Sequence, residues 1–98
     1  MANKNEILKL VPTSLKGKYN WSYGPTIMTH QSALSLLLSL VGFGAIDMFN
    51  SDVWVFISFS TIEEAEASIE KIKSIIGEEL SMKAFTNSAG RHLVRITR

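Results

Sequence analysis

The sequence predicts a two-layer α+β sandwich in which two helices cover one face of an antiparallel sheet, with an extra strand or hairpin at one end. Two segments with helical periodicity alternate with short segments rich in β-branched and aromatic residues. Two pairs of those β-rich segments are joined by short turns, which is typical of antiparallel hairpins. The 98 residues are enough for one core and too few for two ordinary domains, so we expect residues 1–98 to form a single domain.

The N-terminal part of the chain contains two candidate strands. Residues 6–11 show weak alternation and end at a proline, which disfavours helix for the residue before it. Residues 18–23 alternate aromatic and polar side chains, with Tyr19, Trp21 and Tyr23 on one side. Either segment is suited to be the central first strand, and the sequence leaves both possibilities open.

The first helix is expected from Thr29 or His30 to about Val41. Threonine is favoured at a helix N-cap, and Gly42 or Gly44 provides a stop. The interior of this helix is apolar around most of its circumference, and three serines on one stripe interrupt it: Ser32, Ser35 and Ser39. Such a helix is typical of a buried core element. The alternatives are a partner-binding groove and packing against the helix of a second subunit.

Residues 45–49 and 53–59 are expected to pair as an antiparallel hairpin, because a short polar turn joins them. Successive side chains of a strand point to opposite faces, so Trp54 and Phe56 lie side by side on one face. The other face carries Val55, Ile57 and Phe59. Both faces are apolar. One of them must meet the helices, and the other must be covered or used for binding.

A second helix is expected to follow this hairpin directly and to end at Gly77. Thr61 with Glu64, or Ser60 with Glu63, makes a capping box at its start. One stripe of the helix is apolar and is predicted to face the core; its members are Ile62, Ala65, Ile69, Ile72 and Ile76. The opposite side is charged, as in a helix with one face on the surface.

Residues 81–85 and 92–97 are expected to form a last hairpin, which carries basic residues. The order of elements is then strand, helix, strand, strand, helix, strand, with an extra strand at one or both ends. Two helices that cross to one face of an antiparallel sheet in this order give a ferredoxin-like topology.

The charges are unevenly distributed along the chain, although the formal net charge is only +1. Residues 1–46 carry four lysines and one acid, whereas residues 47–79 carry eight acids and two lysines. Residues 80–98 carry four cations and no acid. If the two basic ends lie together in the fold, they create a local positive surface.

The composition excludes several classes of site. The chain contains no cysteine, which excludes disulfides, thiolate zinc sites and cysteine nucleophiles. His30 and His92 are the only histidines and have no acid or second histidine at ligand spacing, so neither a metal nor a cofactor is expected. No nucleophile elbow or phosphate loop occurs. The sequence predicts a protein without enzymatic activity, and a cofactor-free pocket enzyme that uses His30 or His92 is the alternative.

No apolar segment is long enough to span a bilayer, and the first residues lack the apolar stretch of a signal peptide. The sequence therefore predicts a soluble, cytoplasmic protein that does not enter a membrane.

The strand at residues 53–59 resembles the third strand of the RNA recognition motif family. In that family a Lys or Arg, a glycine and alternating aromatics form a signature that stacks on RNA bases. The run Asp52-Val53-Trp54-Val55-Phe56-Ile57-Ser58-Phe59 matches the three aromatic positions of that signature. Asp52 stands in place of the cation, and Val53 and Val55 replace small residues. With residues 25–29 and the start of the second helix, the resemblance covers about residues 19–73. It implies that Trp54 and Phe56 stack on bases of single-stranded RNA.

The predicted binding surface joins Trp54 and Phe56 to aromatic residues of a neighbouring strand and to cations. The aromatic candidates are Tyr19, Trp21 and Tyr23, and the cations are Lys83, Arg91 and Arg95. Each stacked base contributes roughly 1 to 3 kcal/mol, so two exposed rings and three cations provide a weak single-strand site. The alternative is a protein interface: the extra terminal segment, another protein or a second copy in a homodimer covers the aromatic face.

Overall fold

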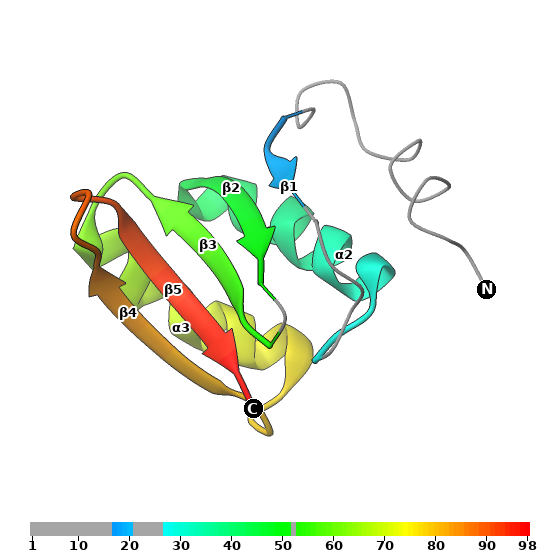
Figure 1. Cartoon of the computed structure of the whole chain (residues 1–98). Coiled ribbons are helices and arrows are strands. Elements are labelled where there is room, and N and C mark those ends of the chain that lie inside the picture. The colour runs from blue at the N-terminus through cyan, green and yellow to red at the C-terminus, as the bar shows by residue number, and fades with distance from the viewer. Residues whose placement is uncertain (1–16, 21–26, 52) are drawn as a thin grey trace.

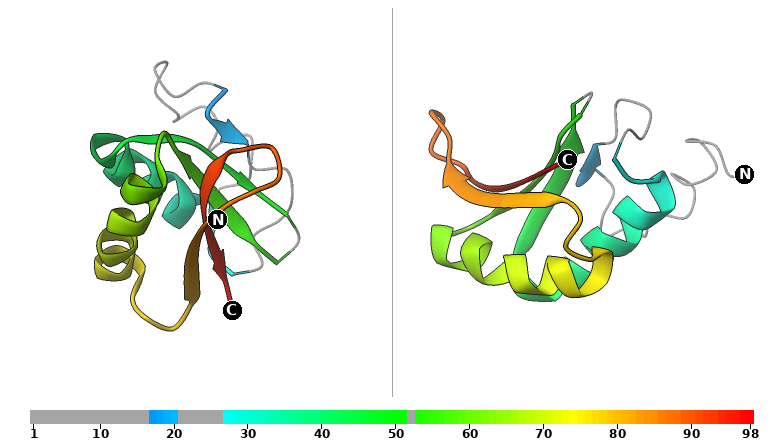
Figure 2. Two further views of the ribbon diagram at one scale, coloured as in Figure 1. Left: turned by 90° about the vertical axis from the view of Figure 1, so that its left-hand side faces the viewer. Right: turned by 90° about the horizontal axis from the view of Figure 1, so that it is seen from below.

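The structure is a computed structural model and describes residues 17–20, 27–51 and 53–98. In this part of the chain, two α-helices pack on one face of a sheet whose strands are mainly antiparallel (Figure 1). The two further views in Figure 2 show the same two layers, with both helices on one side of the strands. The predicted α+β class is therefore confirmed.

The elements follow one another with short connections. In chain order they are β1 (Tyr19–Asn20), α2 (His30–Leu40), the 3₁₀ helix η2 (Val41–Phe43), β2 (Ala45–Asn50), β3 (Val55–Phe59), α3 (Ile62–Ile76), β4 (Ser81–Thr86) and β5 (His92–Thr97). The strands lie in the order β1-β2-β3-β5-β4. β1 runs parallel to β2, and the other neighbouring pairs are antiparallel. Both hairpins that the sequence predicts, β2–β3 and β4–β5, are present.

The order of the strands corrects the expectation that an N-terminal segment is the central strand. β3 has β2 on one side and β5 on the other, so described strands fill the inner places of the sheet. Of residues 18–23, the structure describes a short strand, β1, at the edge beside β2. Residues 6–11 lie outside the described residues. The C-terminal strand β5 lies between β3 and β4 and forms antiparallel pairs with both of them.

Helix α2 begins and ends as its sequence predicts. The Thr29 side chain caps it by accepting a hydrogen bond of 3.0 Å from the backbone N–H of Ser32. The chain then tightens into η2 and stops at Gly44, whose φ of 95° lies in the left-handed region that favours glycine. Five apolar side chains are buried, namely Ala33, Leu34, Leu36, Leu37 and Leu40, whereas Leu38 is 45% exposed and the three serines are exposed as well. This burial confirms α2 as a core helix.

Helix α3 carries the predicted cap and the predicted apolar stripe. The Thr61 hydroxyl accepts a hydrogen bond of 3.1 Å from the backbone N–H of Glu64, and the helix stops at Gly77. Ala65 and Ile72 are fully buried, while Ile62, Ile69 and Ile76 pack against the core from its margin. The acidic side of α3 points away from the sheet, as expected for a helix with one buried face.

The core lies between the helices and one face of the sheet. Ile57 on β3 is opposite Met48 on β2 and Val94 on β5, and none of these three side chains is exposed. Val55 and Phe59 point to the same side and are also buried. Burial of each such side chain contributes about 1.5–3 kcal/mol to stability. The inner face of the 53–59 segment is therefore part of the core, as predicted.

The start of the predicted 53–59 strand differs from the structure. β2 extends to Asn50, and the turn after it is closed by a hydrogen bond of 2.9 Å from the Ser51 N–H to the Trp54 carbonyl. Val53 and Trp54 therefore lie in the turn, and β3 begins at Val55. Trp54 consequently lies directly before the first residue of β3, and 43% of its surface is exposed.

Candidate functional site on the outer sheet face

The candidate site is the sheet face opposite the helices, here called the outer face. Side chains that pair across neighbouring strands share a face, and two rows of such pairs run across β2, β3, β5 and β4. The first row is Phe49, Phe56, Arg95 and Lys83, and the second is Asp47, Ser58, Leu93 and Phe85. Trp54 and Arg91 complete the outer face through the contacts described below. In the described part of the chain, both α-helices pack on the other side (Figure 2).

Four aromatic rings form a cluster on this face with Phe56 at its centre. Phe49 stacks on Phe56 with ring centroids 5.1 Å apart and an angle of 18° between the ring planes. Trp54 and Phe85 approach Phe56 edge-on, at centroid distances of 6.0 and 6.4 Å. Edge-on and stacked contacts of this kind each add about 0.5–1.5 kcal/mol beyond burial. The three phenylalanines are half-buried, so Trp54 is the ring of this cluster with the most free surface.

Arg95 lies between two of these rings. Its guanidinium carbon is 5.9 Å from the centre of the Trp54 ring and 5.7 Å from that of Phe85. Its Nε is buried and has no hydrogen-bond partner in the described part of the chain. No carboxylate among the described residues forms an ion pair with Arg95. The rings hold this cation in place, because guanidinium groups are weakly hydrated and stack readily on aromatic faces.

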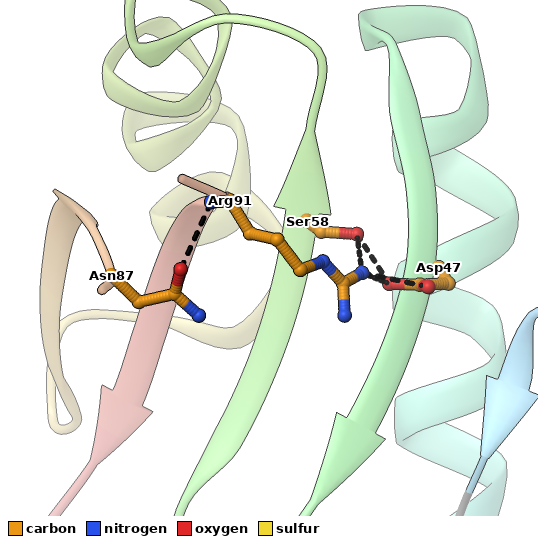
Figure 3. A network of polar contacts seen from close by, with 4 residues as sticks. All are labelled: Asp47, Ser58, Asn87 and Arg91. Atoms are coloured by element: carbon orange, nitrogen blue, oxygen red, sulfur yellow. Dashed lines mark hydrogen bonds and ion pairs between the residues drawn. The ribbon is translucent and has the colours of Figure 1, made fainter. Parts of the chain in front are cut away.

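Arg91 is held differently, by a carboxylate and a hydroxyl (Figure 3). One guanidinium nitrogen, Nη2, donates to both Asp47 carboxylate oxygens and to the Ser58 hydroxyl, each at 2.9 Å. Ser58 in turn donates to Asp47 and is almost fully buried. The backbone N–H of Arg91 donates to the Asn87 side chain in the β4–β5 turn at 2.9 Å. The Arg91 guanidinium carbon also lies 5.5 Å from the centre of the Phe49 ring. The ion pair of Arg91 and Asp47 is therefore adjacent to the aromatic cluster at Phe49.

A pocket of about 210 Å³ lies on β4 and β5 beside Arg95. It is lined by Ser81, Met82, Lys83, Arg95 and Thr97. Lys83 is opposite Arg95 in the strand register, and Ser81 is opposite Thr97. The pocket therefore brings two cations and two hydroxyl groups together on the outer face.

Five of the residues predicted from the sequence come together on this face: Trp54, Phe56, Lys83, Arg91 and Arg95. Tyr19 does not join them. It lies opposite Met48 on the core side, its exposed fraction is 5%, and burial raises the pKa of its phenol above the ordinary value. Trp21, Tyr23 and Asp52 lie outside the described residues.

Sequence reasoning missed five members of the two rows on the outer face: Phe49, Phe85, Asp47, Ser58 and Leu93. Phe85 is two residues after Lys83 on β4, and Phe49 is two residues after Asp47 on β2. This period of two was the available signal, because residues i and i+2 of a strand share a face. The pairing that brings the two phenylalanines to Phe56 depends on the order of the strands, which short segments do not reveal.

The two layers of the molecule carry opposite charges. Among the described residues of the outer face, Lys83, Arg91 and Arg95 accompany one acid, Asp47. The acids of the helix layer lie on α3 and in the turn after it, namely Glu63, Glu64, Glu66, Glu70, Glu78 and Glu79, beside Lys71 and Lys73. This separation favours approach of an anionic partner to the outer face.

Other kinds of site receive little support from the described residues. No group of three or more His, Asp or Glu side chains among them could hold a metal ion. The His92 ring nitrogen Nδ1 and the Thr86 hydroxyl share a hydrogen bond of 2.8 Å across β4 and β5. None of the helices in the described ranges has both the length and the apolar character needed to cross a membrane.

The chain matches no protein-family model, no curated protein and no solved structure. The function must therefore be inferred from the residues of the outer face and their geometry.

Proposed function

We propose that this protein is a non-enzymatic module that binds single-stranded nucleic acid, RNA in particular, on its outer sheet face. The observation that carries the proposal is the position of Trp54. It is a half-exposed ring packed on Phe56, and a guanidinium without an ion-pair partner in the described chain lies beside it. Stacking on an aromatic ring is the contact by which unpaired bases are most often held on a sheet.

The order of elements also supports the proposal, because we interpret it as a variant of the ferredoxin-like sandwich in which one strand is exchanged. From α2 onward the elements run helix, strand, strand, helix, strand, strand. In the ferredoxin-like arrangement, the N-terminal first strand lies between the strands that here are β3 and β4. β5 fills that place and runs antiparallel to both neighbours. In this interpretation the C-terminal strand substitutes for the N-terminal one, and both α-helices of the described residues lie on the same side of the sheet, as in sheet-based RNA-binding modules.

The charges support a polyanion over a neutral partner. Lys83 and Arg95 have no ion-pair partner among the described residues, whereas Arg91 is paired with Asp47. The acids of α3 lie in the opposite layer. A strand of nucleic acid therefore meets cations and rings together on one face and is repelled from the other.

The proposal predicts that removal of the Trp54 ring weakens RNA binding without unfolding the protein. Loss of one stacked base costs about 1–3 kcal/mol, so Kd rises about 5- to 150-fold in Trp54→Ala. The measurement is fluorescence anisotropy of a labelled mixed-sequence 12-nucleotide RNA at fixed salt, with circular dichroism to verify folding. Val53→Ala is the matched control, because Val53 is the exposed neighbour of Trp54 in the same turn and has no ring.

The proposed function is wrong if the wild-type protein fails to bind this RNA, or if Trp54→Ala binds as tightly as the wild type. A DNA oligonucleotide of the same sequence measures the preference for RNA, because the 2′-hydroxyl group distinguishes the two.

A second function, self-association through the outer face, is favoured by the exposed apolar residues at its margin. Ile46, Val53 and Trp54 each expose more than 40% of their surface. In a two-fold dimer, however, each outer face meets a copy of itself, so the interface contains the cations Lys83 and Arg95 of both copies. Sedimentation of wild type and Trp54→Ala without RNA tests this function: a dimer that the substitution dissociates supports self-association and contradicts a free binding face.

A further inference from the structure

We propose that the pocket between β4 and β5 holds a backbone phosphate of the nucleotide whose base stacks on Trp54, with Lys83 and Arg95 as its cations and Ser81 and Thr97 as hydroxyl donors. This inference rests on the proposed function and adds a subsite to it. It predicts that the chain recognises a base and its phosphate as one unit, at two adjacent places on the outer face.

The pocket has the donor chemistry that a phosphate requires. Its lining residues are Lys83 and Arg95, which carry cationic side chains, Ser81 and Thr97, which carry hydroxyl groups, and the apolar Met82, all from two neighbouring strands. Strand register fixes this combination, because Lys83 is opposite Arg95 and Ser81 is opposite Thr97. Asp47, the acid that the described strands place on the outer face, lies across the sheet on β2 and is bound to Arg91. Among the described residues, no acid forms an ion pair with Lys83 or Arg95 and so competes with a phosphate.

Arg95 provides the independent observation that points to a ligand. A buried polar atom without a partner is unfavourable, and the Arg95 Nε has no hydrogen-bond partner among the described residues. The side chain stays in place through the rings of Trp54 and Phe85, which leaves its charge without a counter-ion in the described chain. A planar guanidinium held in a fixed orientation is well suited to a phosphate, which it can contact through two parallel hydrogen bonds.

Arg95 also joins the pocket to the stacking site. It lines the pocket and at the same time lies over the Trp54 ring. A base that stacks on the exposed part of Trp54 consequently has its own backbone beside the pocket. Trp54 directly precedes β3, and the pocket lies on β5 and β4, so in the strand order β2-β3-β5-β4 (Figure 1) a polynucleotide bound at both places crosses β5.

Salt dependence tests the phosphate subsite directly. Each phosphate contact on a single strand contributes about 0.7 to the slope of log Kd against log salt concentration. We expect Lys83→Gln to lower this slope by about 0.7 and to weaken RNA binding at low salt. Lys83 is exposed, so the substitution leaves the core intact. Lys73→Gln on α3 is the matched control, because it removes the same charge from the opposite layer and should leave the slope unchanged.

Arg95→Lys separates geometry from charge. It keeps the positive charge but removes the planar fork and the ring stacking. We expect weaker binding with the slope of the wild type. Trp54→Ala should behave likewise, because a lost base stack is not electrostatic.

The outcomes distinguish this inference from the proposed function. If the wild type binds RNA and Lys83→Gln keeps the wild-type slope, the phosphate subsite is wrong while the binding function stands. If the wild type binds no RNA, the binding function itself fails. Titration with inorganic phosphate, followed through the backbone amide signals of Ser81 and Thr97, tests the source of the phosphate. Saturation by free phosphate at the concentrations at which RNA binds would contradict a subsite for the polynucleotide backbone.

Discussion

Arg91 and Arg95 point to the same face of the last strand but are held by different contacts. Arg91 is bound by the Asp47 carboxylate and the Ser58 hydroxyl, and Arg95 lies between two aromatic rings. A carboxylate neutralises the charge it binds, whereas a ring leaves most of that charge available. At the scale of single residues, the partner of each cation therefore decides whether it can contact an anionic ligand.

This difference predicts the effect of Asp47→Asn. The substitution removes the charge that holds Arg91, so Arg91 becomes free to contact the nucleic acid. We expect tighter RNA binding at low salt and a slope of log Kd against log salt that is steeper by about 0.7. Arg91 and Asp47 are partly exposed to solvent, so the free energy of unfolding should fall by about 1 kcal/mol or less.

Anisotropy titrations at several salt concentrations and urea unfolding provide these two values. An unchanged or shallower slope would show that Arg91 has no access to the ligand even when it is released. Asp47→Asn combined with Arg91→Gln is the control, because the extra slope should disappear when the released cation is absent.

At the scale of elements, the connection between α2 and β2 depends on one glycine. Gly44 has a φ of 95°, and a Cβ added there would overlap the Glu64 carboxylate at the start of α3. The end of the Glu64 side chain can move aside, but the backbone conformation remains unfavourable for any L side chain. Gly42, two residues earlier in η2, has neither constraint: its φ is not in that region, and no atom lies near its Cβ position.

The two glycines therefore form a matched pair. Gly44→Ala should lower the free energy of unfolding by about 1 kcal/mol or more, because alanine disfavours the left-handed conformation. Gly42→Ala should leave stability unchanged or raise it by about 0.4–1 kcal/mol, because it restricts the unfolded chain. Urea denaturation of both variants measures the difference. Equal stabilities would show that the Gly44 conformation is not required for the connection.

The elements themselves could largely be predicted from the sequence, because their signals are local. Thr29 and Thr61 cap the starts of the two helices. Gly44 ends the 3₁₀ helix that follows α2, and Gly77 ends α3. Alternation of side chains indicates the strands of both hairpins. The start of β3 was predicted less accurately than the other boundaries. Trp54 lies outside the strand because its carbonyl accepts a hydrogen bond from the Ser51 N–H across the turn, and this contact cannot be read from the pattern of the strand alone.

At the scale of the whole molecule, the arrangement of the sheet was beyond local patterns. Nothing in residues 92–97 distinguishes an edge strand from an inner one, yet β5 lies between β3 and β4. The place of β5 brings Arg95 to Phe56 and Phe85 to the aromatic cluster. The aromatic pattern of residues 18–23 suggested a strand on the binding face, but Tyr19 pairs with Met48 and is buried in the core. Long-range pairing therefore decided the membership of the candidate site.

The same arrangement separates charges that alternate along the chain. The acidic middle of the sequence forms α3 on the helix side, and the basic C-terminal segment supplies β4 and β5, whose cations reach the outer face. The small net charge of +1 thus conceals a molecule with two electrically different sides. A polyanion is expected to approach through the outer face and to bind less tightly as salt concentration rises.

The central claim is that Trp54 on the outer face stacks on the bases of single-stranded RNA. Trp54 and Trp21 are the two tryptophans of the chain, so Trp21→Phe leaves Trp54 as the sole tryptophan fluorophore. The most direct measurement is the emission of this variant during titration with a mixed-sequence oligoribonucleotide. We predict saturable quenching at the concentrations at which anisotropy detects binding, with a monomer in parallel sedimentation. Unchanged Trp54 emission while the RNA is bound would contradict the claim.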